Sequence, residues 1–105
     1  MFQVLVADDE ATSRISLKAL LERAGYGVIP VADGISAWRI LDSPVPPQIA
    51  VLDWEMPGLT GPDICRKLTG RGDAPFIYTI LLTGRGEEVD IVAGLDAGAH
   101  DYMCK

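Results

Sequence analysis

Strand-like and helix-like segments alternate along the whole chain, and this alternation predicts an open parallel α/β sheet. Short apolar runs rich in branched residues are typical of buried strands, and the segments between them carry apolar residues at helical spacing. Parallel βαβ units with right-handed crossovers place the helices on both faces of one sheet. Neither a repeat nor a linker interrupts the 105 residues, so we expect a single domain with five strands and four helices.

The amino-terminal half contains two strand-helix pairs. Pro30 lacks the backbone N–H that a central strand donates, so the second strand belongs at an edge of the sheet. We predict strands at Phe2–Ala7 and Val28–Val31, and helices at Ala11–Ala24, capped by Thr12 or Ser13 and followed by Gly25, and at Gly34–Leu41.

The carboxy-terminal half continues the pattern. Four apolar residues end abruptly at Asp53, which is followed by a turn containing Pro57 and Gly58, as in a buried strand that delivers one carboxylate to its end. We predict strands at Ile49–Asp53, at Phe76–Thr83, which is covered on both faces, and at Asp101–Lys105, and helices from Gly61 to about Thr69, with Pro62 in the first turn, and at Glu87–Ala97.

Composition limits the class of protein. The formal net charge of −6 argues against direct binding of this segment to nucleic acid or to an anionic membrane. Cys65 and Cys104 have no CxxC spacing and are interpreted as buried thiols of a reducing compartment. His100 is expected in a surface turn. The amino terminus lacks a signal-peptide pattern, and we expect a soluble cytoplasmic protein.

Polar residues lie where several of the predicted strands end. Parallel strands bring their carboxyl ends to one edge, where Asp8, Asp9, Asp53, Thr83 and Lys105 would converge. Two carboxylates about 4 Å apart repel by roughly 4 kcal/mol at an effective dielectric near 20, and a divalent cation removes that cost. Oxygen ligands without His or Cys favour Mg²⁺ or Mn²⁺. A cation, a lysine and a hydroxyl beside a nucleophilic carboxylate suit phosphoryl transfer.

These residues resemble the receiver domain of bacterial two-component response regulators, a family that includes the single-domain chemotaxis regulator. The resemblance covers nearly the whole chain, and it implies a flavodoxin-like sheet with strand order 2-1-3-4-5. The matching motifs arrive in the family's order: Asp8-Asp9, Asp53 with Met56-Pro57-Gly58 and Gly61, Leu82-Thr83-Gly84, and Ala97-Gly98-Ala99 leading to Tyr102 and Lys105.

The resemblance implies that Asp53 accepts a phosphoryl group from a phosphohistidine on a sensor histidine kinase or phosphotransfer protein. The side chains of Asp8, Asp9 and Asp53, with the backbone carbonyl of Glu55, then resemble the Mg²⁺ ligands. Such a domain is a phosphoacceptor that catalyses only its own phosphorylation and dephosphorylation, and it is not otherwise an enzyme.

Three further positions carry implied roles. Thr83 would bond one phosphoryl oxygen, and Lys105 would pair with another. Tyr102 matches the aromatic switch position, whose ring moves inward when the threonine is drawn to the phosphate. Glu55 and Arg85 occupy positions that the family varies. Either their opposite charges pair and tune the lifetime of the phosphate, or both are solvated surface charges that contribute little.

The chain departs from the family pattern at its end. The family domain continues past the lysine into a fifth helix, whereas this sequence stops at Lys105. We expect residues 1–105 to be a receiver truncated before its last helix, or one covered by a second chain as in a homodimer. An effector domain beyond Lys105 is the expected output partner, and its kind is left open.

Other classes of function were weighed. A degenerate receiver acting only as a protein-interaction module is the main alternative. A phosphatase of the haloacid dehalogenase type fits the Asp53-Trp54-Glu55 pattern poorly, and a flavodoxin would need a hydroxyl-rich phosphate loop where Asp8, Asp9 and Glu10 stand.

Overall fold

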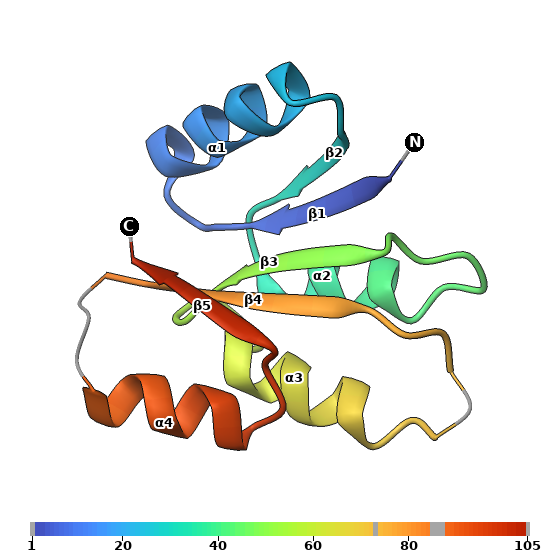
Figure 1. Ribbon diagram of the computed structural model, residues 1–105, viewed down its shortest axis with the longest axis vertical. Coiled ribbons are helices and arrows are strands. Elements are labelled where there is room, and N and C mark those ends of the chain that lie inside the picture. The colour runs from blue at the N-terminus through green and yellow to red at the C-terminus, as the bar shows by residue number, and fades with distance from the viewer. Residues whose placement is uncertain (1, 73, 85–87, 105) are drawn as a thin grey trace.

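The structure is a five-stranded parallel sheet in the order β2-β1-β3-β4-β5 (Figure 1). It is a computed structural model and describes residues 2–72, 74–84 and 88–104. The predicted fold class and strand order are confirmed. The strands are β1 (Gln3–Ala7), β2 (Gly27–Val31), β3 (Ile49–Asp53), β4 (Tyr78–Thr83) and β5 (Asp101–Cys104).

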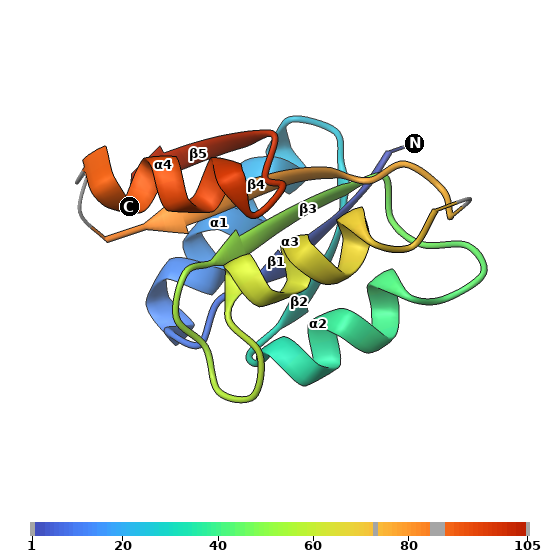
Figure 2. The same cartoon turned by 90° about the horizontal axis from the view of Figure 1, so that it is seen from below.

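Four helices cover the sheet unequally. In Figure 2, α2 and α3 lie in front of the strands and α1 lies behind them. The side-chain contacts agree, because α2, α3 and the segment after α4 share one apolar cluster with the sheet while α1 contributes to another. The helices are α1 (Ala11–Arg23), α2 (Gly34–Leu41), α3 (Gly61–Thr69) and α4 (Glu88–Asp96).

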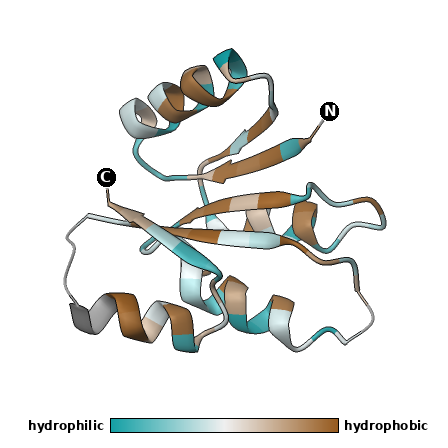
Figure 3. Ribbon diagram, in the orientation of Figure 1, coloured by the Kyte–Doolittle hydropathy of each residue, from teal (hydrophilic) through white to brown (hydrophobic). Residues whose placement is uncertain are grey.

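Alternate residues of the central strands serve the two faces. Leu5 and Leu52 belong to the larger cluster, whereas their neighbours Val6 and Val51 belong to the smaller one. This two-residue period is that of a strand buried on both sides. The brown central strands in Figure 3 show the same concentration of apolar residues. The core therefore centres on β1, β3 and β4, the strands at whose carboxyl ends Asp8, Asp53 and Thr83 lie.

The face that α1 covers has an open groove of about 260 Å³ between α1 and the strands β4 and β5. Leu17 and Leu20 of α1 line one side, and Leu82 and Met103 line the other. Leu20 and Met103 are exposed, and all four residues of β5 are exposed as well. The chain thus covers β5 less completely than the central strands.

Three expectations need correction. Cys104 is exposed because it lies on the edge strand β5, whereas Cys65 is buried as expected. The fourth strand begins at Tyr78 rather than Phe76, which is exposed, and Ile80 is only half-buried, so the strand is not covered on both faces along its length.

The start of α1 also differs from expectation. Glu10 is the N-cap, and its side chain makes no capping hydrogen bond. Ser13 instead donates its hydroxyl to Glu10 Oε1 at 2.7 Å, and the first turn contains no acidic residue. Both Thr12 and Ser13 lie inside the helix. None of the described helices has the length and apolar character needed to span a membrane.

Candidate functional site

Three carboxylates meet at the carboxyl edge of the sheet. Asp53 is the last residue of β3, and Asp8 and Asp9 follow the end of the neighbouring β1. One oxygen from each carboxylate lies within 4.8 Å of the others. Asp8 and Asp53 are buried and Asp9 is exposed. Parallel pairing of β1 with β3 therefore brings together the acidic group that the sequence predicted.

Asp8 is held at its backbone and at its side chain. Its N–H donates to the Val31 carbonyl at the end of β2, at 3.1 Å. Its Oδ1 accepts from the Glu10 N–H at 2.9 Å, and its carbonyl accepts from Arg14 Nη1 at 2.8 Å. These three contacts fix the turn between β1 and α1, from which the exposed Asp9 projects.

The segment after Asp53 is tied to two neighbouring elements. The Trp54 N–H donates to the Leu82 carbonyl of β4 at 3.0 Å, and the Trp54 carbonyl accepts from the Gly61 N–H at 3.1 Å. A Cβ on Gly61 would come within 2.5 Å of the Asp53 carbonyl oxygen, so glycine permits this close approach. Asp53 thus sits on a strand end braced by β4 and by the start of α3.

The remaining predicted site residues differ in burial, and two of them are not described by the structure. Thr83 is buried at the end of β4, and its hydroxyl donates to Cys104 Sγ at 3.8 Å. Tyr102 is exposed on β5, and Glu55 is exposed two residues after Asp53. Arg85 and Lys105 lie outside the described residues.

The acidic group has the composition and spacing of a Mg²⁺ site. Mg²⁺ prefers oxygen ligands in an octahedron with bonds of about 2.1 Å, so opposite ligands lie roughly 4.2 Å apart. Neighbouring ligands of such an octahedron lie roughly 3 Å apart. The three carboxylate oxygens lie within 4.8 Å of one another, so a modest movement of the side chains would let them share one cation. Two of the three are buried, which makes neutralisation by a bound cation more valuable than it is at an exposed surface.

The sequence comparison decides the family. Residues 4–105 match the family model described as the response regulator receiver domain. The chain belongs to this receiver family.

Relatives and solved structures agree with that assignment. The receiver is 34% identical over 106 residues to the chemotaxis protein CheY1 of Helicobacter pylori, a match that covers 98% of this chain and 84% of CheY1. It is 42% identical over 103 residues to the response regulator MprA of Mycobacterium tuberculosis, covering 98% of this chain and 44% of MprA. The receiver domain of the Francisella response regulator 1452 superposes with a TM-score of 0.90 at 27% identity, covering 100% of this chain and 84% of that one.

The receiver spans different fractions of its relatives. It covers 84% of CheY1 but only 44% of MprA and 44% of the response regulator RppA of Synechocystis. Receiver domains are the phosphoacceptor modules of two-component signal transduction, and this chain has their fold and their acidic group.

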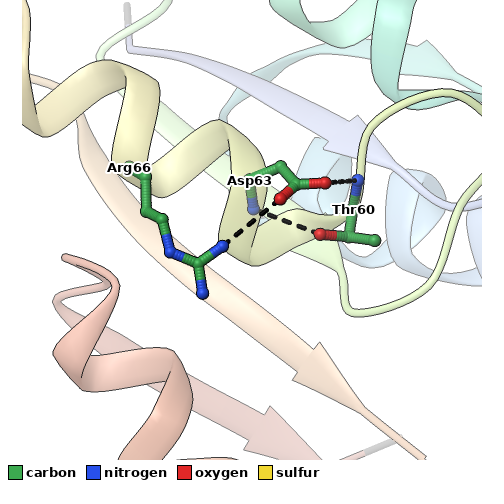
Figure 4. Close-up of polar contacts among 3 residues, drawn as sticks. All are labelled: Thr60, Asp63 and Arg66. Carbon is green, nitrogen blue, oxygen red and sulfur yellow. Dashed lines mark hydrogen bonds and ion pairs between the residues drawn. The ribbon is translucent and has the colours of Figure 1, made fainter.

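A capping box starts α3 just beyond the acceptor segment (Figure 4). The Thr60 hydroxyl accepts from the Asp63 N–H at 3.1 Å, and Asp63 Oδ2 accepts from the Thr60 N–H at 3.1 Å. The hydrogen bond from the Thr60 backbone holds the pKa of Asp63 below its usual value. Arg66 Nη1 contacts the other oxygen of Asp63 at 3.3 Å. These contacts anchor the end of the loop that follows Asp53.

Sequence reasoning missed two polar contacts, one beside the acidic group and one away from it. Arg14, the fourth residue of α1, carries no sequence signal for its contact with the Asp8 carbonyl. His100, expected in a surface turn, is exposed there, and its Nδ1 accepts from the Thr79 N–H at 3.1 Å while its ring stacks on Tyr78. His100 sits before β5 and pairs with the start of β4, so its contacts belong to the opposite edge of the sheet from Asp53.

Proposed function

We propose that this receiver accepts a phosphoryl group on Asp53 from a phosphohistidine of a sensor histidine kinase or a phosphotransfer protein. The observation that carries the proposal is the carboxylate group of Asp8, Asp9 and Asp53, which ends two adjacent strands of a receiver fold. Carboxylates placed this close together cost free energy unless a cation neutralises them. A cation-dependent phosphoryl acceptor requires such a group of carboxylates.

The transfer is a displacement at phosphorus. An oxygen of the Asp53 carboxylate forms a bond to phosphorus as the phosphorus–nitrogen bond of the donor breaks, and the electron pair of that bond returns to the imidazole. Asp8, Asp9 and Asp53, with the Glu55 carbonyl, would hold Mg²⁺ or Mn²⁺. When bound, the cation supplies positive charge that offsets the charge on the transferring group.

Residues at the ends of β4 and β5 are assigned the response to the phosphate. Thr83 would bond one phosphoryl oxygen, giving up its contact with Cys104, and Lys105 would pair with another. Tyr102, exposed in this structure, would then turn inward toward the space that the threonine leaves. These steps convert a charge placed on Asp53 into a change at the β4–β5 edge.

The decisive experiment combines intrinsic fluorescence with intact mass. In a Trp38→Phe background, Trp54 is the remaining tryptophan and adjoins Asp53. We expect its emission to change on adding Mg²⁺ and again on adding acetyl phosphate or beryllium fluoride, and we expect one phosphoryl group by mass with acetyl phosphate.

Two variants sharpen this test. Asp53→Asn is expected to abolish the phosphoryl adduct, whereas Asp42→Asn removes an exposed acid at the end of α2 and is expected to leave it intact. An unmodified wild-type mass together with unchanged fluorescence would reject the phosphoacceptor function in favour of an interaction module without phosphorylation.

The domain and its partners are a second part of the proposal. Residues 1–105 are proposed to be one receiver domain whose open groove is covered, in the working protein, by a following segment or by a second copy. Relatives such as MprA, of which the chain spans 44%, support an output region outside this chain. The open groove of about 260 Å³ between α1 and the strands β4 and β5 supports such a cover.

A further inference from the structure

Arg14 stands at an unfavourable place on its helix. It is the fourth residue of α1, near the helix end at which the helix dipole disfavours a positive charge. The other described basic residue near an end of α1, Arg23, is in the last turn, where the dipole favours it. The position of Arg14 therefore needs a compensating contact.

The compensating contact is with the backbone of the turn that carries Asp8 and Asp9. Arg14 Nη1 donates to the Asp8 carbonyl at 2.8 Å, and the arginine side chain is partly buried. Asp8 is completely buried, and the Glu10 N–H holds its Oδ1 at 2.9 Å. The carbonyl contact acts on the peptide that joins Asp8 to Asp9, so it bears on the direction of both carboxylates.

We propose that Arg14 is a positioning residue for the cation site, and that its hydrogen bond to the Asp8 carbonyl holds the Asp8–Asp9 turn in the geometry that binds Mg²⁺. This inference rests on the proposed function. Arg14 acts through the backbone carbonyl that lies between the two carboxylates.

The direction in which the Mg²⁺ affinity changes when Arg14 is replaced distinguishes a positioning role from a purely electrostatic one. A guanidinium near three carboxylates repels an incoming cation, so a role through charge alone predicts tighter Mg²⁺ binding when Arg14 is replaced by a neutral residue. Loss of a contact that orients metal ligands predicts the opposite, because supporting residues around metal sites contribute about 10–100-fold to affinity. Weaker Mg²⁺ binding after Arg14 is replaced by a neutral residue would therefore indicate positioning, because electrostatics alone predicts tighter binding.

The experiment measures the Mg²⁺ dissociation constant of the whole chain by Trp54 fluorescence in the Trp38→Phe background. Arg14→Met is expected to weaken binding about tenfold. A single nitrogen of Arg14 makes the contact, and lysine keeps a donor and a positive charge there. The Mg²⁺ dissociation constant of Arg14→Lys is therefore expected to lie within about threefold of the wild-type value. Arg23→Met removes the same charge from the far end of α1 and is the matched control, with no expected change.

A second readout excludes a purely structural role. Thermal unfolding is followed with and without Mg²⁺, because a ligand that binds only the folded chain raises the midpoint according to its affinity. A structural role would lower both midpoints of Arg14→Met equally, whereas positioning shrinks the rise that Mg²⁺ produces. If Arg14→Met does not fold, Arg14→Gln, which is uncharged and too short to reach the carbonyl, replaces it with the same expectation.

The outcomes are distinct. Unchanged or tighter Mg²⁺ binding in the neutral variant overturns the proposal, and so does an Arg14→Lys variant that binds as weakly as Arg14→Met. A wild-type chain that binds no Mg²⁺ instead rejects the proposed function itself.

Discussion

Glu55 is the exposed side chain nearest in sequence to the acceptor, and we expect it to tune how long the phosphate lasts. Replacing Glu55 with Asn is predicted to change the dephosphorylation rate by up to about fivefold, the size of a surface ion-pair effect, while phosphoryl uptake persists. The rate is measured by the decay of the Trp54 signal after removal of acetyl phosphate.

Glu22→Gln is the control for this prediction, since it removes an equal charge from the exposed surface of α1. The suggested partner Arg85 lies outside the described residues, so the pairing itself stays a prediction. Identical phosphate lifetimes in wild type, Glu55→Asn and Arg85→Ala would remove the idea.

Gly34 is required at the start of α2 by a close approach of two backbones. A Cβ there would lie against the Leu59 carbonyl, closer than such atoms approach in proteins, and the Gly34 N–H donates to the Pro57 carbonyl at 3.0 Å. We predict that Gly34→Ala destabilises the fold by about 1–3 kcal/mol despite the better helix propensity of alanine. Urea unfolding provides the measurement.

Gly70→Ala is the matched control, because a Cβ there meets Arg66 and Lys67 carbonyl oxygens only at ordinary contact distances. Its φ of −81° suits any residue. Equal stabilities of the two alanine variants would contradict the steric explanation for Gly34.

Individual residues could be predicted where a pattern of charge or hydropathy ended abruptly. Asp8, Asp9 and Asp53 each follow an apolar run, and the structure brings them together. The exposure of Cys104 could not be predicted in the same way, because it depends on what covers β5 rather than on the sequence around the thiol. The contact of Arg14 with a backbone carbonyl likewise leaves no compositional signal.

At the scale of elements, the capping box links α3 to the acceptor loop and gives a pH-dependent stability. The folded pKa of Asp63 lies below its unfolded value of about 4, chiefly because the Thr60 backbone N–H bonds its carboxylate. Its contribution to stability is therefore complete above about pH 4 and is lost as the pH falls through the folded pKa.

Asp63→Ala tests this linkage. The variant is predicted to be less stable than wild type by about 1 kcal/mol at pH 7, and the difference should shrink at pH 3 and below. Chemical unfolding at both pH values measures it, and Asp101→Ala, an exposed acid on β5, serves as the comparison. A stability difference that grows on acidification would contradict the assignment.

Element order was predictable because two different hydrophobic periods alternate along the chain, whereas element ends were less so. The fourth strand loses its first two predicted residues because Phe76 and Ile77 precede the hydrogen-bonded pairing with β3. An apolar run predicts that a segment is buried, but the first residue of the strand depends on where its hydrogen bonds to the neighbouring strand begin. The cap of α1 was misplaced since Glu10 occupies the N-cap without a side-chain bond.

At the scale of the whole molecule, the uncovered groove predicts association. Leu20 and Met103 are exposed on opposite sides of it, and burying exposed apolar side chains favours association. We predict that residues 1–105 self-associate at micromolar concentration or bind an apolar fluorescent dye, and that Leu20→Ser weakens both. Sedimentation and dye titration are the measurements.

Val45→Ser is the control, because Val45 is more exposed than Leu20 but lies in the loop between α2 and β3, away from the groove. A stable monomer of this span that binds no dye would count against both a missing cover and a second chain.

The overall topology was the most predictable feature, because chirality and parallel pairing leave few arrangements for five strands joined by helices. The resemblance to receivers supplied the strand order 2-1-3-4-5, which the structure has. Local patterns alone do not distinguish which strand lies beside which, since that choice depends on contacts between residues distant in sequence.

The placement of Asp53 between β1 and β4 has a consequence for when the chain can receive a signal. Asp8 and Asp9 follow the first strand, Asp53 ends the third and Thr83 ends the fourth, so these residues come together only when the strands have paired. If Asp53 is the phosphoryl acceptor proposed above, a chain in which any of these strands is not yet docked lacks the assembled site. We then expect an unfolded or damaged copy not to compete with folded copies for the donor's phosphoryl group.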